Sequence, residues 1–407
     1  MAELLFLAHR IPYPPNKGDK IRSWNILRFL AQHYRVHLGC FIDDPADEQH
    51  RATLEAICES CRFVPLDPTI SRLRSLGGLA SGAPLTLPYF WNRGLAAWTE
   101  TLLRERPIEH VFAFSSSMAQ YVLGDAAERA RRVIDYVDVD SDKWRQYAAA
   151  KSWPASWIYG RESRTLLAFE RRVARAADAC LFVSEAEAEL FRRLAPDSAA
   201  RTYAFSNGVD YGFFDPSVGH DRPFDGAGGN LVFTGAMDYW ANIDAVTWFA
   251  REVLPAIRAA RPDVRFWIVG AKPADPVSSL QSIAGVHVTG SVPDVRPYIL
   301  HADIVVAPLR LARGIQNKVL EAMAMGRPVI ASPEALEGIT ADVGSEVICA
   351  GSAREFADRT VSLLGDPDAA VIGRRARQRV IDGYGWAANL AVLKKLLENG
   401  PLNCGRT

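Results

Sequence analysis

Short apolar segments alternate with longer helical segments along the whole chain, and this alternation constrains the fold more than any other sequence feature. In the first half we expect strands at 4–8, 36–41, 62–65, 111–114, 132–136 and 179–183, and helices at 20–33, 46–59, 117–126 and 163–176. The pattern begins again in the second half, with strands at 231–234, 265–269, 286–289, 304–308, 328–331 and 346–350, and helices at 243–261, 295–302, 317–325 and 353–365. Continuous apolar strands joined by helices form parallel sheets covered on both faces, so the sequence predicts an α/β fold.

The length of the chain and one polar segment near its middle predict two domains. A chain of 407 residues is too long for one ordinary core and suits two domains of about 150–200 residues. The segment 206–210, Ser-Asn-Gly-Val-Asp, is followed by Pro216 and the glycine-rich stretch 225–230, as is typical of a domain boundary. We therefore predict domains at 1–207 and 208–383, each a doubly wound Rossmann-like unit, and a last helix near 387–398.

Charge and apolar content exclude several classes of protein. Lysine plus arginine equals aspartate plus glutamate at 47 each, so no overall field favours nucleic acid. The N-terminal MAELLFLAHR lacks a basic segment before its short apolar run, so we interpret it as a first strand and not as a signal peptide. No apolar stretch approaches the roughly 20 residues that span a bilayer, so we expect a soluble or peripheral protein. The six scattered cysteines fit ordinary reduced thiols, which is consistent with a cytoplasmic protein.

The segment 310–331 is the most informative part of the chain for function. It follows the expected strand 304–308, turns at Gly314 and enters a helix that carries Lys318 and Glu321. The free N–H groups and the positive end of such a helix suit a diphosphate, and Lys318 adds a positive charge in the first turn. Glu321, one turn further along, could accept hydrogen bonds from ribose hydroxyls. A capped surface helix with incidental charges fits the same residues equally well on physics alone.

Five motifs in the second half resemble, in the right order, those of the retaining GT-B glycosyltransferases of family 4. They are Asn-Gly-Val-Asp at 207–210, Phe-Thr-Gly at 233–235, Ile-Val-Gly at 268–270, Gly-Ser-Val-Pro-Asp at 290–294 with Ala-Asp at 302–303 and Ala-Pro at 307–308, and LEAMAMGRPVIAS at 320–332. The segments HRIPYPPNKGDKIRSWNIL, DYVDVDSDKW and TGAMDYWANIDAV resemble the sugar transferases associated with PEP-CTERM/exosortase systems. The resemblance to that subgroup extends over nearly the whole chain.

The resemblance implies a GT-B fold, in which two Rossmann-like doubly wound domains face each other across a cleft. It implies that domain 1–207, with a C-terminal helix at 384–400 packing back on it, binds the acceptor, and that domain 208–383 binds the donor. A hexosyl unit would pass, with retention, from a nucleoside-diphosphate sugar of UDP or GDP type to an acceptor hydroxyl, and no cofactor would be required. The subgroup further implies exopolysaccharide biosynthesis, a glycan or polyprenyl-diphosphate-linked acceptor, and peripheral association with the inner face of the cytoplasmic membrane.

The chain departs from the family pattern at several positions, so we expect the positive charges near the diphosphate to come from other residues than in the family. The family's pair of glutamates needs an acid eight residues before Glu321, where this chain has Arg313. The usual Arg and Lys after the Phe-x-Gly strand are missing from a region that contains Met237 and Asn242. We therefore expect Lys318 to bind the diphosphate and Arg310 to assist at the leaving group. The residues expected to bind the donor are Gly235, Val292, Arg313, Gly314, Asn317, Lys318 and Glu321.

The loop 12–22 after the first strand is a candidate contact for the acceptor or for phosphate. Its glycine lets backbone approach a ligand closely, and its basic side chains, Lys20 among them, could meet a phosphate. The resemblance implies that the loop faces the cleft. A solvated loop in which an aspartate caps the helix start is the alternative. The candidate residues of this site are His9, Lys17, Gly18, Asp19 and Arg22.

Asp138, Asp140 and Asp142 follow the expected strand 132–136 and allow two interpretations. Asp-x-Asp often binds a divalent metal in the other glycosyltransferase fold, but an EF-hand loop would need glycine where Lys143 stands. The resembled family does not require a metal, so we expect none. We assign Asp138 to catalysis, where it could orient an acceptor hydroxyl or face the reacting carbon.

The segment 143–164 is rich in tryptophan, tyrosine and basic residues. Aromatics beside cations can seat a protein at a lipid interface or stack on a sugar. We favour the alternative, a pair of helices that packs these aromatics on its own core.

Three other functions are compatible with such a fold and stay as alternatives. A nucleotide-sugar 2-epimerase would need acids and histidines in the cleft, where only His9 stands at a strand end. A dinucleotide oxidoreductase would need Gly-x-Gly-x-x-Gly after a strand, whereas the first strand leads into Pro12. A non-catalytic GT-B scaffold is suggested by Arg313 in place of the family's first glutamate.

Overall fold

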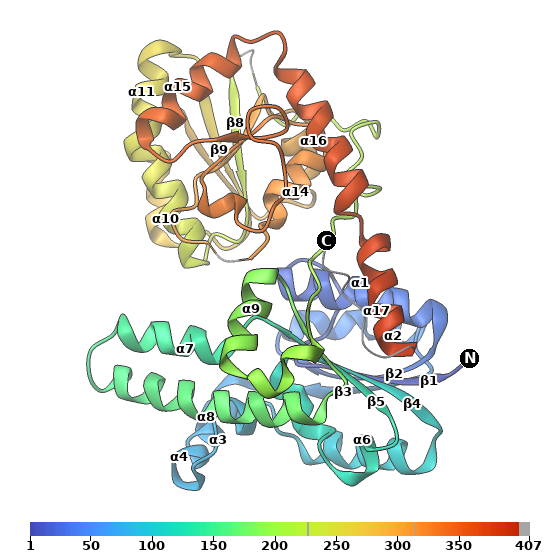
Figure 1. The fold of residues 1–407 in the computed structure, drawn as a ribbon. Coiled ribbons are helices and arrows are strands. Elements are labelled where there is room, and N and C mark those ends of the chain that lie inside the picture. Colours follow the sequence, from blue (N-terminus) through green and yellow to red (C-terminus); the bar gives the residue numbers. More distant parts are fainter. Residues whose placement is uncertain (226–227, 313, 399–407) are drawn as a thin grey trace. The chain divides into compact units, whose positions relative to one another are not determined.

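The structure, a computed structural model, describes residues 1–225, 228–312 and 314–398 and divides the chain into two compact units. Unit 1 is Met1–Ser206 together with the chain from Leu390, and unit 2 is Asn207–Asn389. Each unit has its own parallel sheet with helices packed against it (Figure 1). The repeated alternation of strands and helices thus forms two Rossmann-like α/β units.

The sheet of unit 1 has, in the described residues, seven parallel strands in the order β3-β2-β1-β4-β5-β6-β7. Every residue of the interior strand β1 is buried, which explains why Leu4–Ala8 form a continuous apolar run. The strands are β1 (Glu3–Ala8), β2 (Arg35–Ile42), β3 (Ser60–Pro65), β4 (Ile108–Phe114), β5 (Arg131–Val137), β6 (Ala179–Phe182) and β7 (Thr202–Ala204).

The helices of unit 1 follow these strands as crossover connections. Ser184 caps α9 by accepting a hydrogen bond from the Glu187 backbone N–H. The α-helices are α1 (Gly18–His33), α2 (Arg51–Glu55), α3 (Pro68–Ser75), α4 (Gly77–Ser81), α5 (Thr86–Tyr89), α6 (Arg93–Glu105), α7 (Asp140–Ala149), α8 (Ala155–Ala176) and α9 (Glu185–Leu194). Short 3₁₀ segments lie at Pro45–His50, Ser116–Tyr121, Asp125–Ala127 and Pro196–Arg201.

The sheet of unit 2 repeats this strand order. Its six strands, within the described part of the chain, are parallel and run β10-β9-β8-β11-β12-β13. They are β8 (Asn230–Thr234), β9 (Arg265–Val269), β10 (Val286–Gly290), β11 (Ile304–Ala307), β12 (Val329–Ala331) and β13 (Ile348–Cys349).

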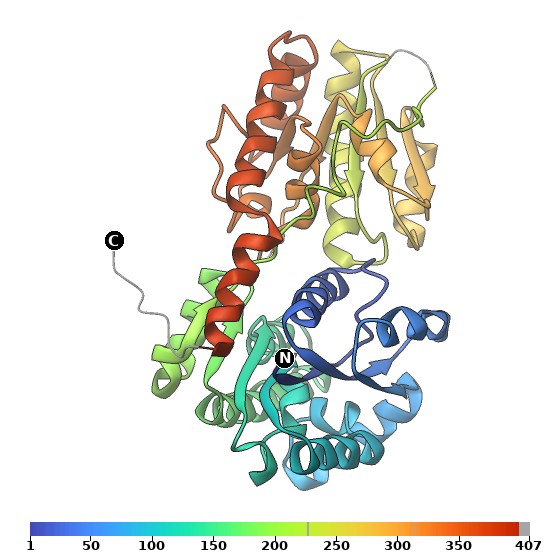
Figure 2. The same cartoon turned by 90° about the vertical axis from the view of Figure 1, so that its right-hand side faces the viewer.

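The helices of unit 2 pack their apolar faces against this sheet, and the buried side chains of helices and strands form one hydrophobic core. They are α10 (Trp240–Trp248), α11 (Leu254–Ala260), α12 (Asp275–Ser278), α13 (Arg296–Leu300), α14 (Asn317–Ala324), α15 (Ala353–Leu364) and α16 (Ala369–Gly383). Short 3₁₀ segments lie at Ser279–Ser282 and Glu334–Leu336. Helix α16, red in Figure 2, packs against α14. The last helix, α17 (Trp386–Glu398), begins in unit 2 and ends in unit 1, where Arg131 Nε donates to the carbonyl oxygen of Leu396 at 2.6 Å.

Several elements differ from the sequence prediction. The helix expected at 117–126 is replaced by short 3₁₀ turns, and the helix expected at 243–261 is interrupted by a π-helical segment, Phe249–Val253, just before Pro255. Helices α3 to α6, helix α16 and strand β7 were not predicted. None of the helices formed by the described residues is both long and apolar enough to cross a bilayer.

The strand order fixes where ligands can bind in each unit. The order reverses between β1 and β4 in unit 1 and between β8 and β11 in unit 2. Ligands of open α/β sheets bind beyond the carboxyl ends of the strands at such switch points. The candidate sites are therefore the residues that follow β1 and β4, and those that follow β8 and β11.

Candidate functional site

The carboxyl end of β8 in unit 2 is a place of close backbone approach. A Cβ atom on Gly270, which follows β9, would lie 1.7 Å from the carbonyl oxygen of Gly235, which follows β8. Only glycine fits such a contact. The adjacent Thr234 side chain is buried, and its Oγ1 has no hydrogen-bond partner among the described residues. At this strand end two backbone segments therefore pack directly against each other, and the Thr234 hydroxyl has no hydrogen-bond partner among the described residues.

Lys318 lies beside this strand end, in the first turn of α14. The chain turns at Gly314, whose φ of 63° favours glycine, and then enters the helix. Lys318 Nζ donates to Asn242 Oδ1 at 2.5 Å and lies 4.3 Å from the centroid of the Phe233 ring. The other amide atom of Asn242 donates to the Ala236 carbonyl oxygen at 2.8 Å. The amide of Asn242 therefore holds the ammonium group at the carboxyl end of β8.

Burial makes the charge of Lys318 expensive to hold. It lowers the pKa of Lys318 from its ordinary 10.5 to about 7, although Glu321 opposes this change. Burial also raises the pKa of Glu321 from 4.5 to about 7, against the effect of Lys318. Both side chains are partly exposed. An anionic ligand beside Nζ would stabilise the ionised lysine, so the pair is suited to bind one.

The start of α14 carries further groups suited to an anion. Asn317, its first residue, has a buried Oδ1 that no described residue contacts by a hydrogen bond. Gln316 at the N-cap provides no side-chain hydrogen bond to the helix N–H groups of the described chain. The positive end of the helix thus adds to the charge of Lys318.

The other predicted donor residues lie around the same end of the sheet or outside the described chain. Arg310 pairs with Asp244 of α10, its Nε lying 3.0 Å from Oδ2, and it is about half exposed. Val292 follows β10 and packs partly buried against the core of unit 2. Arg313 lies outside the described residues.

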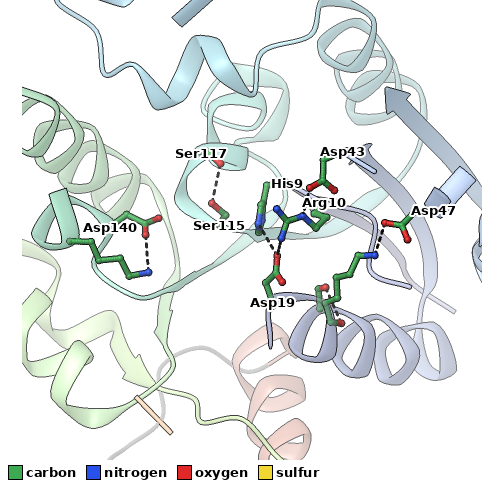
Figure 3. A network of polar contacts seen from close by, with 11 residues as sticks. His9, Arg10, Asp19, Asp43, Asp47, Ser115, Ser117 and Asp140 are labelled. Atoms are coloured by element: carbon green, nitrogen blue, oxygen red, sulfur yellow. Dashed lines mark hydrogen bonds and ion pairs between the residues drawn. The ribbon is translucent and has the colours of Figure 1, made fainter. Parts of the chain in front are cut away.

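In unit 1 the residues after β1 form a polar network, shown in Figure 3. Asp19 Oδ2 lies 3.5 Å from His9 Nε2 and 2.5 Å from an Arg10 terminal nitrogen, and Arg10 Nε lies 2.8 Å from Asp43 Oδ2. Burial alone would raise the pKa of Asp19, but His9 and Arg10 outweigh it and lower that pKa. His9 Nδ1 and Asp43 Oδ1 are buried without a hydrogen-bond partner among the described residues. The network therefore keeps a carboxylate and a histidine at the switch point.

Backbone strain marks the neighbouring strand ends. Ser115 after β4 has a φ of 80°, and Val137 at the end of β5 has a φ of 68°, a region that side chains, and above all β-branched ones, avoid. Such strain clusters at functional sites.

Lys143 Nζ lies 2.7 Å from Asp138 Oδ2 and 3.2 Å from Asp140 Oδ1, the second contact being drawn in Figure 3.

The aspartates after β5 do not converge on one point. Asp142 accepts from Arg145 Nε at 2.6 Å and from Gln146 Nε2 at 2.5 Å, whereas Asp138 and Asp140 share Lys143. Among the described residues, no group of three or more His, Cys, Asp or Glu side chains could hold a metal ion.

The loop 12–22 separates into an exposed part and a buried part. Lys17 and Gly18 are exposed, and a Cβ on Gly18 would meet nothing within 4 Å. Arg22, in contrast, is fully buried and paired with the fully buried Asp135, its Nε lying 2.8 Å from Oδ2. Lys20 is buried and lies 2.7 Å from Asp47 Oδ2. The expected phosphate contacts of Arg22 and Lys20 are therefore corrected to buried ion pairs, because both side chains point into the core of unit 1.

Comparison with known proteins identifies the domain that carries the Lys318 site. No curated protein sequence matches the chain. Residues 228–366 match the family model described as Glycosyl transferases group 1. The chain contains a glycosyltransferase group 1 domain. The protein is accordingly a glycosyltransferase, and this group 1 domain includes Gly235, Asn242, Lys318 and Glu321.

Solved structures show the GT-B fold over the whole chain at low sequence identity. Sucrose-phosphate synthase from Thermosynechococcus elongatus has a TM-score of 0.69 and 17% identity, covering 97% of this chain and 98% of its own. HepE of Anabaena in complex with UDP and glucose has a TM-score of 0.67 and 17% identity, covering 98% and 99%. WaaG, a glycosyltransferase involved in lipopolysaccharide biosynthesis, has a TM-score of 0.66 and 16% identity, covering 98% and 100%.

The structure adds residues to the site of the group 1 domain that the sequence did not assign. Asn242 holds Lys318, Phe233 lies under its ammonium group, and Asp244 pairs with Arg310. In the sequence Asn242 stands out only as a replacement for a basic residue after the Phe-Thr-Gly strand end. Its position shortly after that strand end was the signal that could have marked Asn242 as a site residue. Its partner Lys318, however, lies 76 residues further along the chain.

Proposed function

We propose that the protein transfers a hexosyl unit from a nucleoside-diphosphate sugar to an acceptor hydroxyl, with retention of anomeric configuration. The observation that carries this proposal is the position of Lys318 Nζ at the carboxyl end of β8, where Asn242 Oδ1 holds it at 2.5 Å. Negative charge develops on the leaving diphosphate as the bond from the anomeric carbon breaks. A cation already in place there lowers the barrier, because it need not reorganise during the reaction.

Unit 2 is proposed to bind the donor. Lys318 and the N-terminus of α14 would hold the diphosphate, with Asn317, Gly314 and Gly235 close to it. Glu321 would accept hydrogen bonds from the ribose, and Val292 would contact the base. Arg310 is proposed as an auxiliary cation that must share its charge with Asp244.

Unit 1 is proposed to bind the acceptor. His9 and Asp19 offer a histidine and a carboxylate at the switch point of its sheet, while Lys17 and Gly18 are exposed near them in the sequence. Asp138 would orient the acceptor hydroxyl, which passes its proton to the departing diphosphate oxygen as its own oxygen bonds to the anomeric carbon. Its partner Lys143 would fix that carboxylate in place.

The type of donor and the pathway are proposed from the similarity of this chain to solved structures of glycosyltransferases. The HepE structures contain UDP or UDP-glucose, which favours a UDP-type donor over a GDP-type donor for this chain. WaaG acts in lipopolysaccharide biosynthesis, which supports a role in cell-surface glycan or exopolysaccharide assembly. The same proposal includes membership of family 4 and of the PEP-CTERM/exosortase subgroup. It also includes a polyprenyl-diphosphate-linked acceptor and a cytoplasmic, peripheral membrane location.

A donor-turnover assay tests the proposal. The protein is incubated with UDP-sugars and GDP-sugars, and release of the nucleoside diphosphate is measured for wild type, Lys318→Ala and Lys395→Met. The control Lys395 is exposed on α17 and is not one of the residues assigned to the donor or acceptor site. We expect release with at least one donor, its near loss in Lys318→Ala and no change in Lys395→Met. No release with any donor would favour the non-catalytic scaffold, and a product of inverted configuration would refute retention.

A further inference from the structure

Helix α3 of unit 1 buries polar side chains and exposes apolar ones. Ser71 and Ser75 are 4% and 9% exposed, and Ser75 Oγ donates to the Ser71 carbonyl oxygen at 2.8 Å. Ile70 and Leu73 on the same helix are 55% and 66% exposed. A surface helix ordinarily has the opposite arrangement, because exposing apolar area to water is unfavourable.

The exposed apolar side chains continue from α3 into α4 with a spacing of three residues. Leu76 is 55% exposed and Leu79 is 39% exposed. Together Ile70, Leu73, Leu76 and Leu79 form what we call the apolar stripe. A contiguous row of this kind on a surface marks an interaction site more often than single exposed residues do.

Two exposed tryptophans lie at the N-terminal end of α8, the helix that contacts the segment of the stripe. Arg161 of α8 donates to the carbonyl oxygen of Gly78, between Leu76 and Leu79, at 2.6 Å. Trp157 precedes Arg161 by four residues and so lies on the same side of α8. It is 56% exposed, and Trp153, just before the helix, is 79% exposed. Figure 1 shows α3 and α4 beside α8.

The remaining aromatics of this region contact one another, although Tyr147 is still 45% exposed. Trp144 contacts the Tyr147 and Tyr159 rings, with centroids 5.8 and 5.2 Å away. These contacts join α7 to α8. The aromatic content of the helical pair is therefore divided between a packed cluster and the exposed pair Trp153 and Trp157.

The charges around the stripe are mostly positive, with Asp67, at the N-cap of α3, as an exposed acid beside it. The segments 68–81 and 151–164 contain one acid, Glu162, which is 1% exposed and accepts hydrogen bonds from the backbone N–H groups of Leu85 and Thr86 at 2.6 and 3.0 Å. The whole chain, in contrast, balances its acids and bases at 47 each. The cations of these two segments are Arg72, Arg74, Lys151, Arg161 and Arg164.

We propose that the apolar stripe, with Trp153 and Trp157, docks unit 1 on the surface of an anionic lipid bilayer. Apolar side chains would enter the boundary between headgroups and acyl chains, tryptophans prefer that depth, and the cations attract anionic headgroups. A second copy of this chain fits less well, because it would bring like charges together. The inference deepens the peripheral location proposed above, but it does not depend on sugar transfer.

Co-flotation with lipid vesicles tests the docking surface without any nucleotide. We expect wild type to float with vesicles of phosphatidylcholine and phosphatidylglycerol, to bind phosphatidylcholine alone much more weakly, and to dissociate as salt is raised. The affinity of the variant Leu73→Ser/Leu76→Ser for these vesicles should be lower by about tenfold or more, because two apolar groups no longer enter the interface. The control Val218→Ser/Val343→Ser, which removes exposed valines of unit 2, should bind like wild type.

A second measurement distinguishes loss of the docking surface from loss of folding in the variants. In wild-type protein, brominated lipid should quench tryptophan fluorescence, and the quenching should fall in Trp153→Phe/Trp157→Phe. Donor turnover in solution should be unchanged in the stripe variant, which separates this proposal from the transferase proposal. Failure of wild type to bind anionic vesicles, or binding unaffected by the stripe variant, would overturn the inference. So would a dimer in sedimentation experiments that the stripe variant abolishes.

Discussion

Replacing Lys318 by methionine should stabilise the protein in the absence of nucleotide and remove most of its affinity for nucleoside diphosphates. Burial moves the pKa of Lys318 from 10.5 to about 7, which corresponds to at most about 4–5 kcal/mol against the ionised side chain. Methionine is unbranched, apolar and adaptable, so it can occupy the same space. Because Glu321 loses a compensating charge, we expect a smaller net gain of about 1–3 kcal/mol.

The loss of affinity follows from the same lysine. A hydrogen bond to a charged partner contributes about 1.5–3 kcal/mol, so binding should weaken by about 10- to 150-fold. Thermal unfolding without nucleotide should show a midpoint raised by about 2–4 °C for each kcal/mol gained. Calorimetric titration gives the affinity, and Lys395→Met serves as the control. A variant that is less stable than wild type, or one that binds nucleotide equally well, would refute this reasoning.

The pH dependence of stability provides a signed test of the Lys318–Glu321 pair. Between about pH 7 and 10.5 the unfolded lysine holds a proton that the folded one has lost, so this group makes stability rise with pH. Between pH 4.5 and about 7 the folded Glu321 holds a proton that the unfolded one has lost, so this group makes stability fall. The contribution of the pair should therefore pass through a minimum near pH 7. Urea unfolding across this range should show the alkaline rise in wild type and lack it in Lys318→Met.

Three further substitutions test other parts of the structure. Gly270→Ala should lower the free energy of unfolding by about 2–4 kcal/mol, whereas Gly219→Ala, which meets nothing within 4 Å, should change it little; equal effects in urea unfolding would contradict the close approach at Gly235. Asp135→Ala should cost about 3–5 kcal/mol because it leaves Arg22 buried without its carboxylate, and a loss below about 1 kcal/mol would contradict that. Asp138→Asn should slow transfer to an acceptor but leave nucleotide affinity unchanged in calorimetry; weaker nucleotide binding would place Asp138 at the donor instead.

The central strands could be predicted from the sequence because burial on both faces gives them continuous apolar runs. β1 is an example, since all its residues are buried. Helix α3 escaped prediction for the opposite reason: it buries serines and exposes Ile70 and Leu73, so its apolar residues do not mark a face directed at the core.

The candidate site could be predicted only where its residues are close in sequence. Gly314, Lys318 and Glu321 lie on one turn and one short helix, and local rules place them together. Asn242 is 76 residues away from Lys318, and Asp135 is 113 residues away from Arg22. Pairings of this kind depend on the tertiary fold, which is why the buried role of Arg22 was not evident from its neighbours.

Calorimetric titration of UDP, GDP and ADP at about pH 8, in two buffers of different ionisation enthalpy, shows whether a nucleoside diphosphate binds beside Lys318. At this pH Lys318 is mostly neutral without ligand, and a diphosphate beside Nζ should recharge it. We predict that at least one of the three nucleotides binds with uptake of nearly one proton, and that Lys318→Met abolishes this uptake. Binding with no proton uptake, or no binding of any of the three, would contradict a diphosphate site at Lys318.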